Sequence, residues 1–162
     1  MNKKVTLLII FTLMLSFLGG FYNKALSEND KTEVKVQNTV ATINTTSLNI
    51  VSNPNKFLNK KVKFQASFDK FSTLGLDYKK ALRPANKYIG ILIQRDDVVD
   101  HDIPLSEMKL FMKKEMAEKH IDLDTGDKIE ITANVFSTAL NDPWLDIEEL
   151  KVIKKAKKEE VK

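Results

Sequence analysis

The clearest alternation of apolar and polar positions lies in residues 126–140, GDKIEITANVFSTAL. Its apolar positions recur at every second residue, at Ile129, Ile131, Ala133 and Val135. A period of two places one set of side chains on a buried face and the other in water. The turn residues Asn-Asp-Pro at 141–143 separate this stretch from a second alternation that begins at Trp144. The pattern predicts a β-hairpin that closes a small β-domain.

Residues 61–68 repeat the same alternation earlier in the chain. Their apolar positions are Val62, Phe64, Ala66 and Phe68. The phase slips between Phe68 and Phe71, as it does where one extra residue forms a β-bulge. Both alternations have alanine at a middle inward position, which suits a tightly curved barrel. We therefore expect the two strands to pair and share one curved core.

Weaker patterns complete the list of elements. A short helix is predicted after a Thr/Ser cap at 45–47 and is expected to end at Asn53–Pro54. Residues 75–87 read as a loop, with one helical turn near 78–82, and residues 88–95 as a strand. Residues 103–120 fit either one amphipathic helix or a strand over 108–112 followed by a helix over 113–120. Helix propensity favours the first interpretation, but the order of the other elements favours the second, which we adopt.

The first 27 residues are expected to be a targeting segment rather than part of the folded domain. Lys3 and Lys4 precede an uncharged, mostly apolar run over 5–18, and Ala25-Leu-Ser offers small residues for cleavage. This is the pattern of a signal peptide; the alternative is an uncleaved membrane anchor. Either interpretation predicts an exported protein, periplasmic or extracellular, and membrane-anchored if the leader is retained. Residues 28–42 are polar and read as a flexible linker.

The net charge of +4 is concentrated at the two ends of the chain. Residues 1–27 contain three lysines and no acid, and the charged tail that begins near residue 154 contains five lysines and two glutamates. The chain between is acidic. A basic pI of about 9.1 therefore does not indicate nucleic-acid binding in this case. There is no cysteine, which excludes a disulfide framework and thiolate metal sites.

The predicted order is strand, strand, strand, short helix, strand, strand, and it resembles an OB-fold. In that family a five-stranded Greek-key barrel carries a helix between its third and fourth strands. The resemblance covers 43–154 and rests on NPNKFLNKKV at 53–62, on Leu123-x-x-Gly126 before the fourth strand, and on the small mid-strand residue. Secreted bacterial OB-fold proteins and tRNA-anticodon-type OB domains are similar. The fold class implied is mainly β with one short helix, in a five-stranded OB-like barrel.

Charge is segregated along the domain, with basic residues over 56–87 and acidic residues over 96–150. One interpretation is a basic ligand-binding face with nearby aromatic residues, since OB-folds pair a positive groove with stacking platforms. Its candidate residues are Lys61, Lys63, Tyr78, Lys79, Lys80, Arg83, Tyr88 and Trp144. The other interpretation is a solvated surface in which Lys61 and Lys63 face Glu130 on a neighbouring strand. Trp144 could likewise be a platform or pack over the barrel end, and we favour packing.

No catalytic or metal-binding motif is present. The acidic run 96–102 could hold a hard cation through its carboxylates with His101 as a further ligand, but a loop of acids is usually only solvated, which we favour. The loop 122–127 lacks the spacing of a calcium site. Neither His101 nor His120 lies in a catalytic motif. We therefore predict no enzyme activity, no metal and no cofactor.

These observations predict a non-enzymatic, monomeric OB-fold binding module of the bacterial envelope. An unknown polyanion or an envelope protein would be its partner. The alternative is a structural or assembly protein that holds another envelope protein. Single-stranded nucleic-acid binding is a lesser alternative, and membrane contact is expected only through an uncleaved leader.

Overall fold

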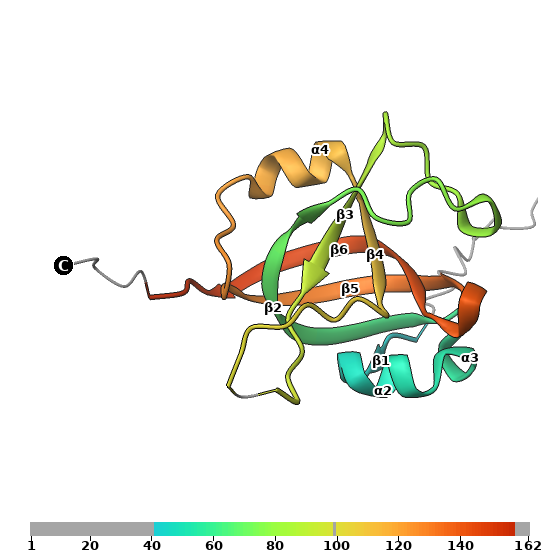
Figure 1. The fold of residues 1–162 in the computed structure, drawn as a ribbon, viewed down its shortest axis with the longest axis horizontal. Helices are drawn as coiled ribbons and strands as arrows, with labels where there is room; N and C mark the ends of the chain where they lie inside the picture. The colour runs from blue at the N-terminus through green and yellow to red at the C-terminus, as the bar shows by residue number, and fades with distance from the viewer. Residues whose placement is uncertain (1–40, 99, 158–162) are drawn as a thin grey trace, which may run out of the picture. The chain divides into compact units, whose positions relative to one another are not determined.

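The computed structural model describes residues 41–98 and 100–157 (Figure 1). The predicted leader, residues 28–40 of the predicted linker and the end of the charged tail lie outside these ranges. No helix in the described ranges is long and apolar enough to cross a membrane. The elements follow one another as β1 Ile43–Asn44, α2 Ser47–Ser52, α3 Pro54–Phe57, β2 Lys61–Ser72, η1 Lys79–Ala81, β3 Tyr88–Ile93, β4 Lys109–Lys113, α4 Lys114–Ala117, η2 Glu118–His120, β5 Lys128–Ser137, η3 Ala139–Asn141 and β6 Trp144–Lys154.

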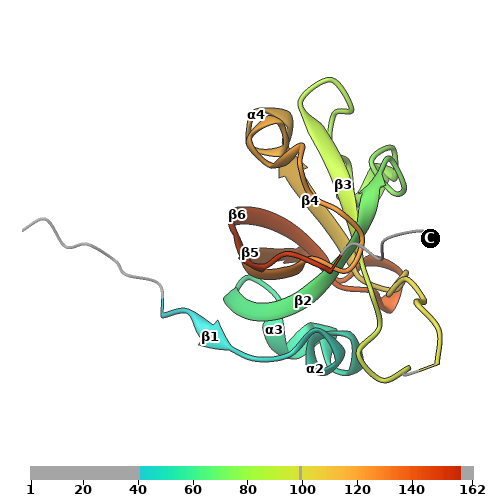
Figure 2. The same ribbon diagram turned by 90° about the vertical axis from the view of Figure 1, so that its left-hand side faces the viewer.

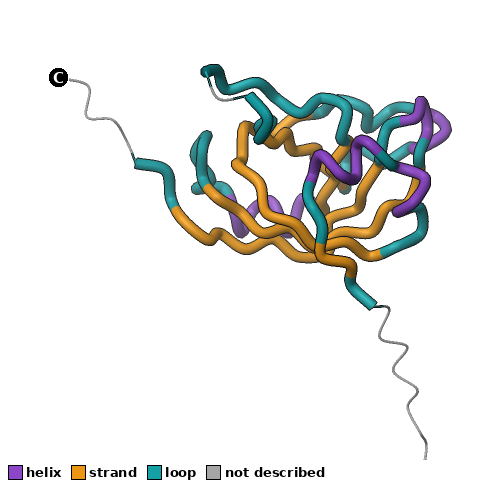
Figure 3. The backbone as a smooth tube through the Cα atoms, turned by 90° about the horizontal axis from the view of Figure 1, so that it is seen from below, coloured by secondary structure: helices purple, strands orange, loops and turns teal. Residues whose placement is uncertain are grey.

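The strands form a closed barrel in the order β2-β3-β4-β6-β5, with β5 returning to β2 (Figures 1 and 2). Figure 3 shows the same strands in orange, seen from below. The pairing of β4 with β6 is parallel and the other four are antiparallel. α4 lies between the third and fourth barrel strands. The predicted fold class, mainly β with a five-stranded OB-like barrel, is confirmed. The two-residue β1 adds a parallel partner beside the start of β2.

β2 is the longest strand and serves both halves of the barrel. From Lys61 to Ser67 it pairs with β5, and from Phe68 to Ser72 with β3. The register shifts between Phe68 and Lys70, so the predicted bulge is confirmed. A bulge bends its strand and increases the local twist, which lets one strand turn from one partner to the other. The green ribbon of β2 shows this bend in Figure 2.

The barrel core consists of the alternating residues that the sequence placed inward. Both predicted sets, 62–68 and 129–135, are buried at their inward positions. Ala133 lies opposite Val62, and Ala66 lies opposite Ile129. Each alanine thus faces a branched side chain on the partner strand, which fills the narrow interior without overpacking. The predicted pairing of the two strands is confirmed.

The segment over 103–120 forms a strand followed by a helix, as we favoured, and the single-helix alternative is wrong. β4 places Leu110 and Met112 in the barrel core. Its backbone continues into α4 and η2, whose Met116 and Ala117 pack against the same core. The seven-residue helical part covers one end of the barrel in Figure 1.

The segment before β2 differs in one respect from the prediction. Thr46 caps α2, accepting a hydrogen bond from the N–H of Asn49 at 3.2 Å, and Ile50 is fully buried. Helix α2 ends before Pro54 as expected, but Pro54 then starts a second short helix, α3. Proline suits the first helical position, because its missing N–H would have had no helical partner there.

Side chains on the outer face of β2 form ion pairs with the hairpin. Lys63 lies 2.7 Å from Glu130 on β5, as the solvated-surface interpretation predicted. Lys61 does not face Glu130; it lies 2.6 Å from Glu148 on β6. Exposed pairs of this kind stabilise a fold by less than about 1 kcal/mol each. They neutralise this part of the basic region.

Candidate ligand-binding surface

A second apolar cluster lies outside the barrel, on the outer face of β4 and β6. Leu110 and Met112 point inward, so the alternation turns Phe111 outward. Phe111 is nevertheless only 1% exposed, because the chain between β2 and β3 folds over it. The buried members of this outer cluster are Leu76, Ala81, Phe111 and Trp144. The outer face of the sheet is therefore covered by the protein's own loop.

The covering loop, residues 75–83, has defined ends. Gly75 adopts φ +83°, and a Cβ there would lie 3.1 Å from Cζ3 of Trp144, so both the backbone and the close approach require glycine. The N–H of Arg83 donates to the carbonyl of Leu76 at 2.9 Å and closes the loop. Between them η1 supplies the helical turn that the sequence predicted.

Trp144 forms the floor of this arrangement. Its ring stacks on Tyr78, with centroids 5.1 Å apart and planes inclined by 21°. Its Nε1–H donates to the carbonyl of Ala139 at 2.7 Å. The indole is 1% exposed, which agrees with the packing interpretation. Tyr78, half-buried above it, is the aromatic ring nearest to solvent here.

Arg83 fastens the loop to β6. Its guanidinium donates two hydrogen bonds to the Asp146 carboxylate, from Nε at 2.8 Å and from Nη2 at 2.6 Å. It also lies over the ring of Phe136, 3.6 Å from the centroid, and 5.8 Å from the ring of Tyr88. The hydrogen bonds to Asp146 raise the pKa of Arg83, so the guanidinium is charged at any physiological pH. Arg83 therefore has a structural partner and is not free to bind a ligand.

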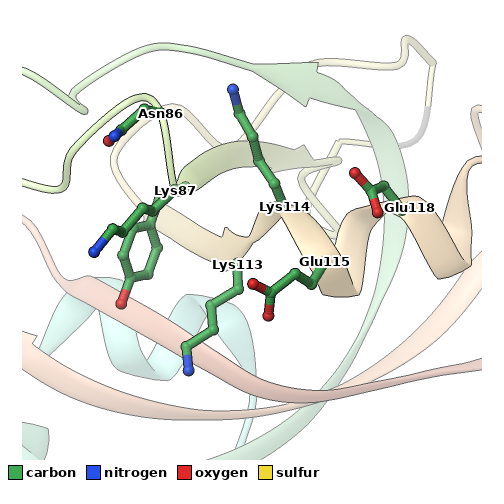
Figure 4. Close-up of a pocket in the computed structure, with 7 residues that line it drawn as sticks. Asn86, Lys87, Lys113, Lys114, Glu115 and Glu118 are labelled. Carbon is green, nitrogen blue, oxygen red and sulfur yellow. The ribbon is translucent and has the colours of Figure 1, made fainter.

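One groove lies where β3 begins and β4 ends, and we call it the lysine groove. Its volume is about 610 Å³. Figure 4 shows its lining residues, Asn86, Lys87, Tyr88, Lys113, Lys114, Glu115 and Glu118. The side chains of Lys113 and Lys114 extend in opposite directions from the junction of β4 with α4. Tyr88 and Lys113 are register partners, so the groove is held by a direct strand pairing.

A second groove lies toward the other end of β4, and we call it the leucine groove. It has a volume of about 570 Å³. Its floor and rim are Gly75, Tyr78, Lys79, Lys80, Leu140 and Trp144, with Lys109 and Asp77 beside them. A smaller hollow of about 230 Å³ shares Gly75 and Lys109 with it and includes Leu74. Lys109 and Lys113 are both on β4, so the two grooves lie about 13 Å apart along one strand.

The lysines of these grooves, Lys109 apart, differ from the lysines of β2 in their ion pairing. Within residues 41–98 and 100–157, ion pairs hold Lys61, Lys63, Arg83 and Lys109. Among those same residues no ion pair is found for Lys79, Lys80, Lys87, Lys113 and Lys114. Unpaired ammonium groups that line a groove attract anions, and the low-dielectric wall beside them strengthens that attraction.

The eight residues proposed from sequence are distributed over four places. Tyr78, Lys79, Lys80 and Trp144 meet in the leucine groove. Tyr88 lines the lysine groove, and Arg83 lies beneath the loop. Lys61 and Lys63 are in neither groove and pair with acids on the outer face of β5 and β6.

Sequence reasoning missed Lys109, Lys113, Lys114 and Leu140 as members of these grooves. A signal for two of them was present: Lys109, Phe111 and Lys113 alternate with the core residues Leu110 and Met112. That alternation places both lysines on the outer face of the strand that we favoured. In the ranges that the structure describes, no three metal-ligating side chains lie together.

No known protein-family signature matches the chain, and no curated protein matches its sequence. Solved structures do match its fold. An asparaginyl-tRNA synthetase from Entamoeba histolytica aligns with 74% of this chain and 25% of its own, at 15% identity and a TM-score of 0.44. The structure of yeast Stn1 and Ten1 aligns with 70% of this chain and 81% of its own, at 13% identity and a TM-score of 0.46. OBody AM1L10, solved bound to hen egg-white lysozyme, aligns with 62% of this chain and 85% of its own, at 10% identity and a TM-score of 0.41. The chain thus spans about a quarter of the synthetase, and these likenesses are too distant to assign a function.

Proposed function

We propose that the domain is a non-enzymatic binding module for an anionic ligand. The ligand lies across the outer surface of β3 and β4 and contacts the lysine groove first. One observation carries this proposal: Lys87, Lys113 and Lys114 line one groove and have no ion pair among the described residues, whereas lysines on β2 do. Lysines that stabilise the fold by their charge are expected to have acidic partners, as the lysines of β2 have.

Two acids reduce the positive charge of the lysine groove without cancelling it. Glu115 and Glu118 lie on its α4 side, and Lys87 and Tyr88 lie on its β3 side. An anion entering from the β3 side meets the Lys87 ammonium before it meets either carboxylate. Asn86 adds an amide that can donate a hydrogen bond. The groove is therefore suited to a carboxylate, sulfate or phosphate group that is held by charge and oriented by hydrogen bonds.

We also propose that the module acts outside the cytoplasm. The support is the predicted leader over 1–27. Fractionation of cells that express the tagged chain would test this, and recovery of the chain from the cytosol alone would contradict it.

The binding proposal is tested by titrating the full chain, purified in a mild non-ionic detergent, with three labelled polyanions. Heparin, poly-glutamate and a single-stranded oligo-dT would be used at 50 and 300 mM salt. We expect at least one to bind, with weaker binding at higher salt. Lys87→Glu/Lys113→Glu should weaken that binding by about tenfold or more.

The matched control is Lys56→Glu/Lys60→Glu. These lysines are exposed, lie in neither groove and make no ion pair among the described residues. The control reverses the same number of charges and should change affinity less than threefold. Equal weakening by both double variants, or binding of none of the three polyanions, would refute the proposal.

A further inference from the structure

We propose that the leucine groove binds an acidic polypeptide segment of a partner protein, inserting an aliphatic side chain of that segment beside Leu140. This inference rests on the proposed function and names the partner class for the same outer surface. It depends on three properties of the groove: an exposed leucine in an unfavourable backbone conformation, an indole already covered by Tyr78, and unpaired lysines at the rim.

Leu140 is unfavourable for the free protein in two independent ways. Its side chain is 68% exposed, and its backbone has φ +62°. A leucine in the left-handed region is rare, and glycine or asparagine would adopt it at lower cost. The next residue, Asn141, has the same φ of +62° and is of the suitable type. The turn between β5 and β6 sets this conformation, since the N–H of Asp142 donates to the carbonyl of Ala139 at 3.2 Å and both central residues have positive φ. The turn does not require leucine, however, and an exposed apolar residue kept in a strained conformation supports a binding role.

The apolar surface around Leu140 continues to both sides. Leu74, 62% exposed, borders the smaller hollow that shares Gly75 and Lys109 with the leucine groove. Tyr78 and Trp144 line the leucine groove with Leu140, and the shared Gly75 and Lys109 connect this groove to the hollow beside Leu74. An extended peptide can place alternate side chains in two neighbouring hollows of this kind.

The available rings favour a peptide over a nucleic acid. Single-stranded nucleic acids bind OB-folds through open aromatic faces on which bases stack. Here Trp144 is covered by Tyr78, and Phe111 is 1% exposed beneath the loop. The most exposed apolar groups are instead aliphatic. Aliphatic groups stabilise a partner by burying its apolar area, which a leucine, isoleucine or valine side chain provides.

Charge selects the composition of that peptide. Lys79 and Lys80 are exposed at the rim, and Asp77 is the one acid among the residues that line the groove. Lys109 is neutralised by Asp142, 3.4 Å away. The rim is therefore positive, and it complements aspartate or glutamate residues on either side of the inserted aliphatic residue.

The test is a selection of displayed random 12-residue peptides on the immobilised full chain. We expect enriched sequences to contain two or more acidic residues around a leucine, isoleucine or valine. A synthetic peptide of the winning sequence should then bind Leu140→Asn about tenfold or more weakly than wild type, since burying a leucine changes affinity by tenfold to a hundredfold. Lys79→Glu/Lys80→Glu should weaken it similarly.

Controls separate loss of the groove from loss of the fold. Asparagine adopts the left-handed backbone at lower cost than leucine, so Leu140→Asn should melt at or above the wild-type temperature. Ile121→Asn removes another apolar side chain, 82% exposed and outside both grooves, and should leave peptide affinity unchanged. Melting temperatures of all variants would be measured alongside affinity.

Each outcome bears on one proposal. Enriched peptides that bind Leu140→Asn as well as wild type would overturn the peptide inference. If a polyanion still binds and is sensitive to Lys87→Glu/Lys113→Glu, the proposed function survives that result. Oligo-dT binding weakened by Leu140→Asn would overturn the inference in favour of nucleic acid. Failure to bind any polyanion or peptide would overturn both.

Discussion

Arg83 and Asp146 join the loop over 75–83 to β6 through two hydrogen bonds of 2.8 and 2.6 Å. Both side chains are less than one-third exposed. The guanidinium also lies over the ring of Phe136. A two-point contact between planar groups fixes orientation as well as distance. Docking of the loop on the outer cluster therefore depends strongly on this pair.

We predict that Arg83→Ala and Asp146→Ala each lower the free energy of unfolding by about 1–3 kcal/mol. The double variant should lose less than the sum, with a coupling of about 1 kcal/mol or more. Arg83→Lys should recover little, because an ammonium cannot make the paired contact. Urea denaturation of the four proteins measures the cycle. A coupling near zero would show that the pair does not hold the loop.

Trp144 offers a direct report on loop docking, since it is the only tryptophan in the sequence. We predict that Tyr78→Ala shifts its fluorescence to longer wavelength and raises acrylamide quenching, because the ring that covers the indole is removed. Tyr88→Ala is the control, since Tyr88 makes no ring contact with Trp144. An unchanged spectrum in Tyr78→Ala would contradict the observed stack.

Leu140→Gly is predicted to stabilise the protein by about 1 kcal/mol, because glycine removes the cost of a left-handed leucine. For a domain of this size that corresponds to a rise in melting temperature of about 3–6 °C. Leu74→Gly, a leucine of similar exposure without the positive φ, should not stabilise. Calorimetry compares the two variants. Destabilisation by Leu140→Gly would mean that the leucine contributes to the fold.

Acid sensitivity is predicted to depend on Asp127, which is fully buried. Burial alone would raise the pKa of this carboxyl, but the N–H groups of Ala156 and Asp124 and the ammonium of Lys155 together lower it below its ordinary value. A lowered folded-state pKa stabilises the native state above the unfolded-state pKa. That contribution disappears as the pH falls through the folded-state value.

The wild type should therefore lose stability as the pH falls below about 4. Asp127→Asn should be less stable than wild type at pH 7 by about 1–3 kcal/mol. The difference should shrink at lower pH, where the wild-type carboxyl is also neutral. Urea denaturation from pH 7 to pH 2.5 measures both curves. A constant difference across that range would contradict the role of the carboxylate.

The barrel could be predicted well from the sequence because each strand shows its alternation within its own residues. Val62 to Phe68 and Ile129 to Val135 alternate with a period of two, and the phase slip after Phe68 marked the bulge. Local patterns of this kind follow directly from pleat geometry. Even the choice between one helix and a strand plus helix over 103–120 followed once the other strands were counted.

The candidate ligand-binding surface was less predictable than the barrel, because it depends on contacts between residues far apart in the sequence. Arg83 and Asp146 are 63 positions apart, and neither sits in a recognisable motif. The composition of the loop over 75–83 does not indicate that this loop packs on Trp144 and Phe111. Lys61 and Lys63 were grouped with Lys79 and Lys80 by their closeness in sequence, yet the barrel turns them toward the acids of β5 and β6. The conformation of Leu140 contradicts leucine's own backbone preference, so no local pattern announces it.

The way β2 is shared between β3 and β5 also sets the order in which the chain can fold. The β2–β3 and β3–β4 pairings need only nearby residues, but the pairing along Lys61–Ser67 needs β5, a strand made much later. Until β5 has emerged during synthesis, Val62 and Phe64 lack their partners. Such non-local pairing slows folding and prolongs the exposure of apolar strands. The newly made chain is therefore most vulnerable to aggregation and proteolysis just before its final hairpin arrives.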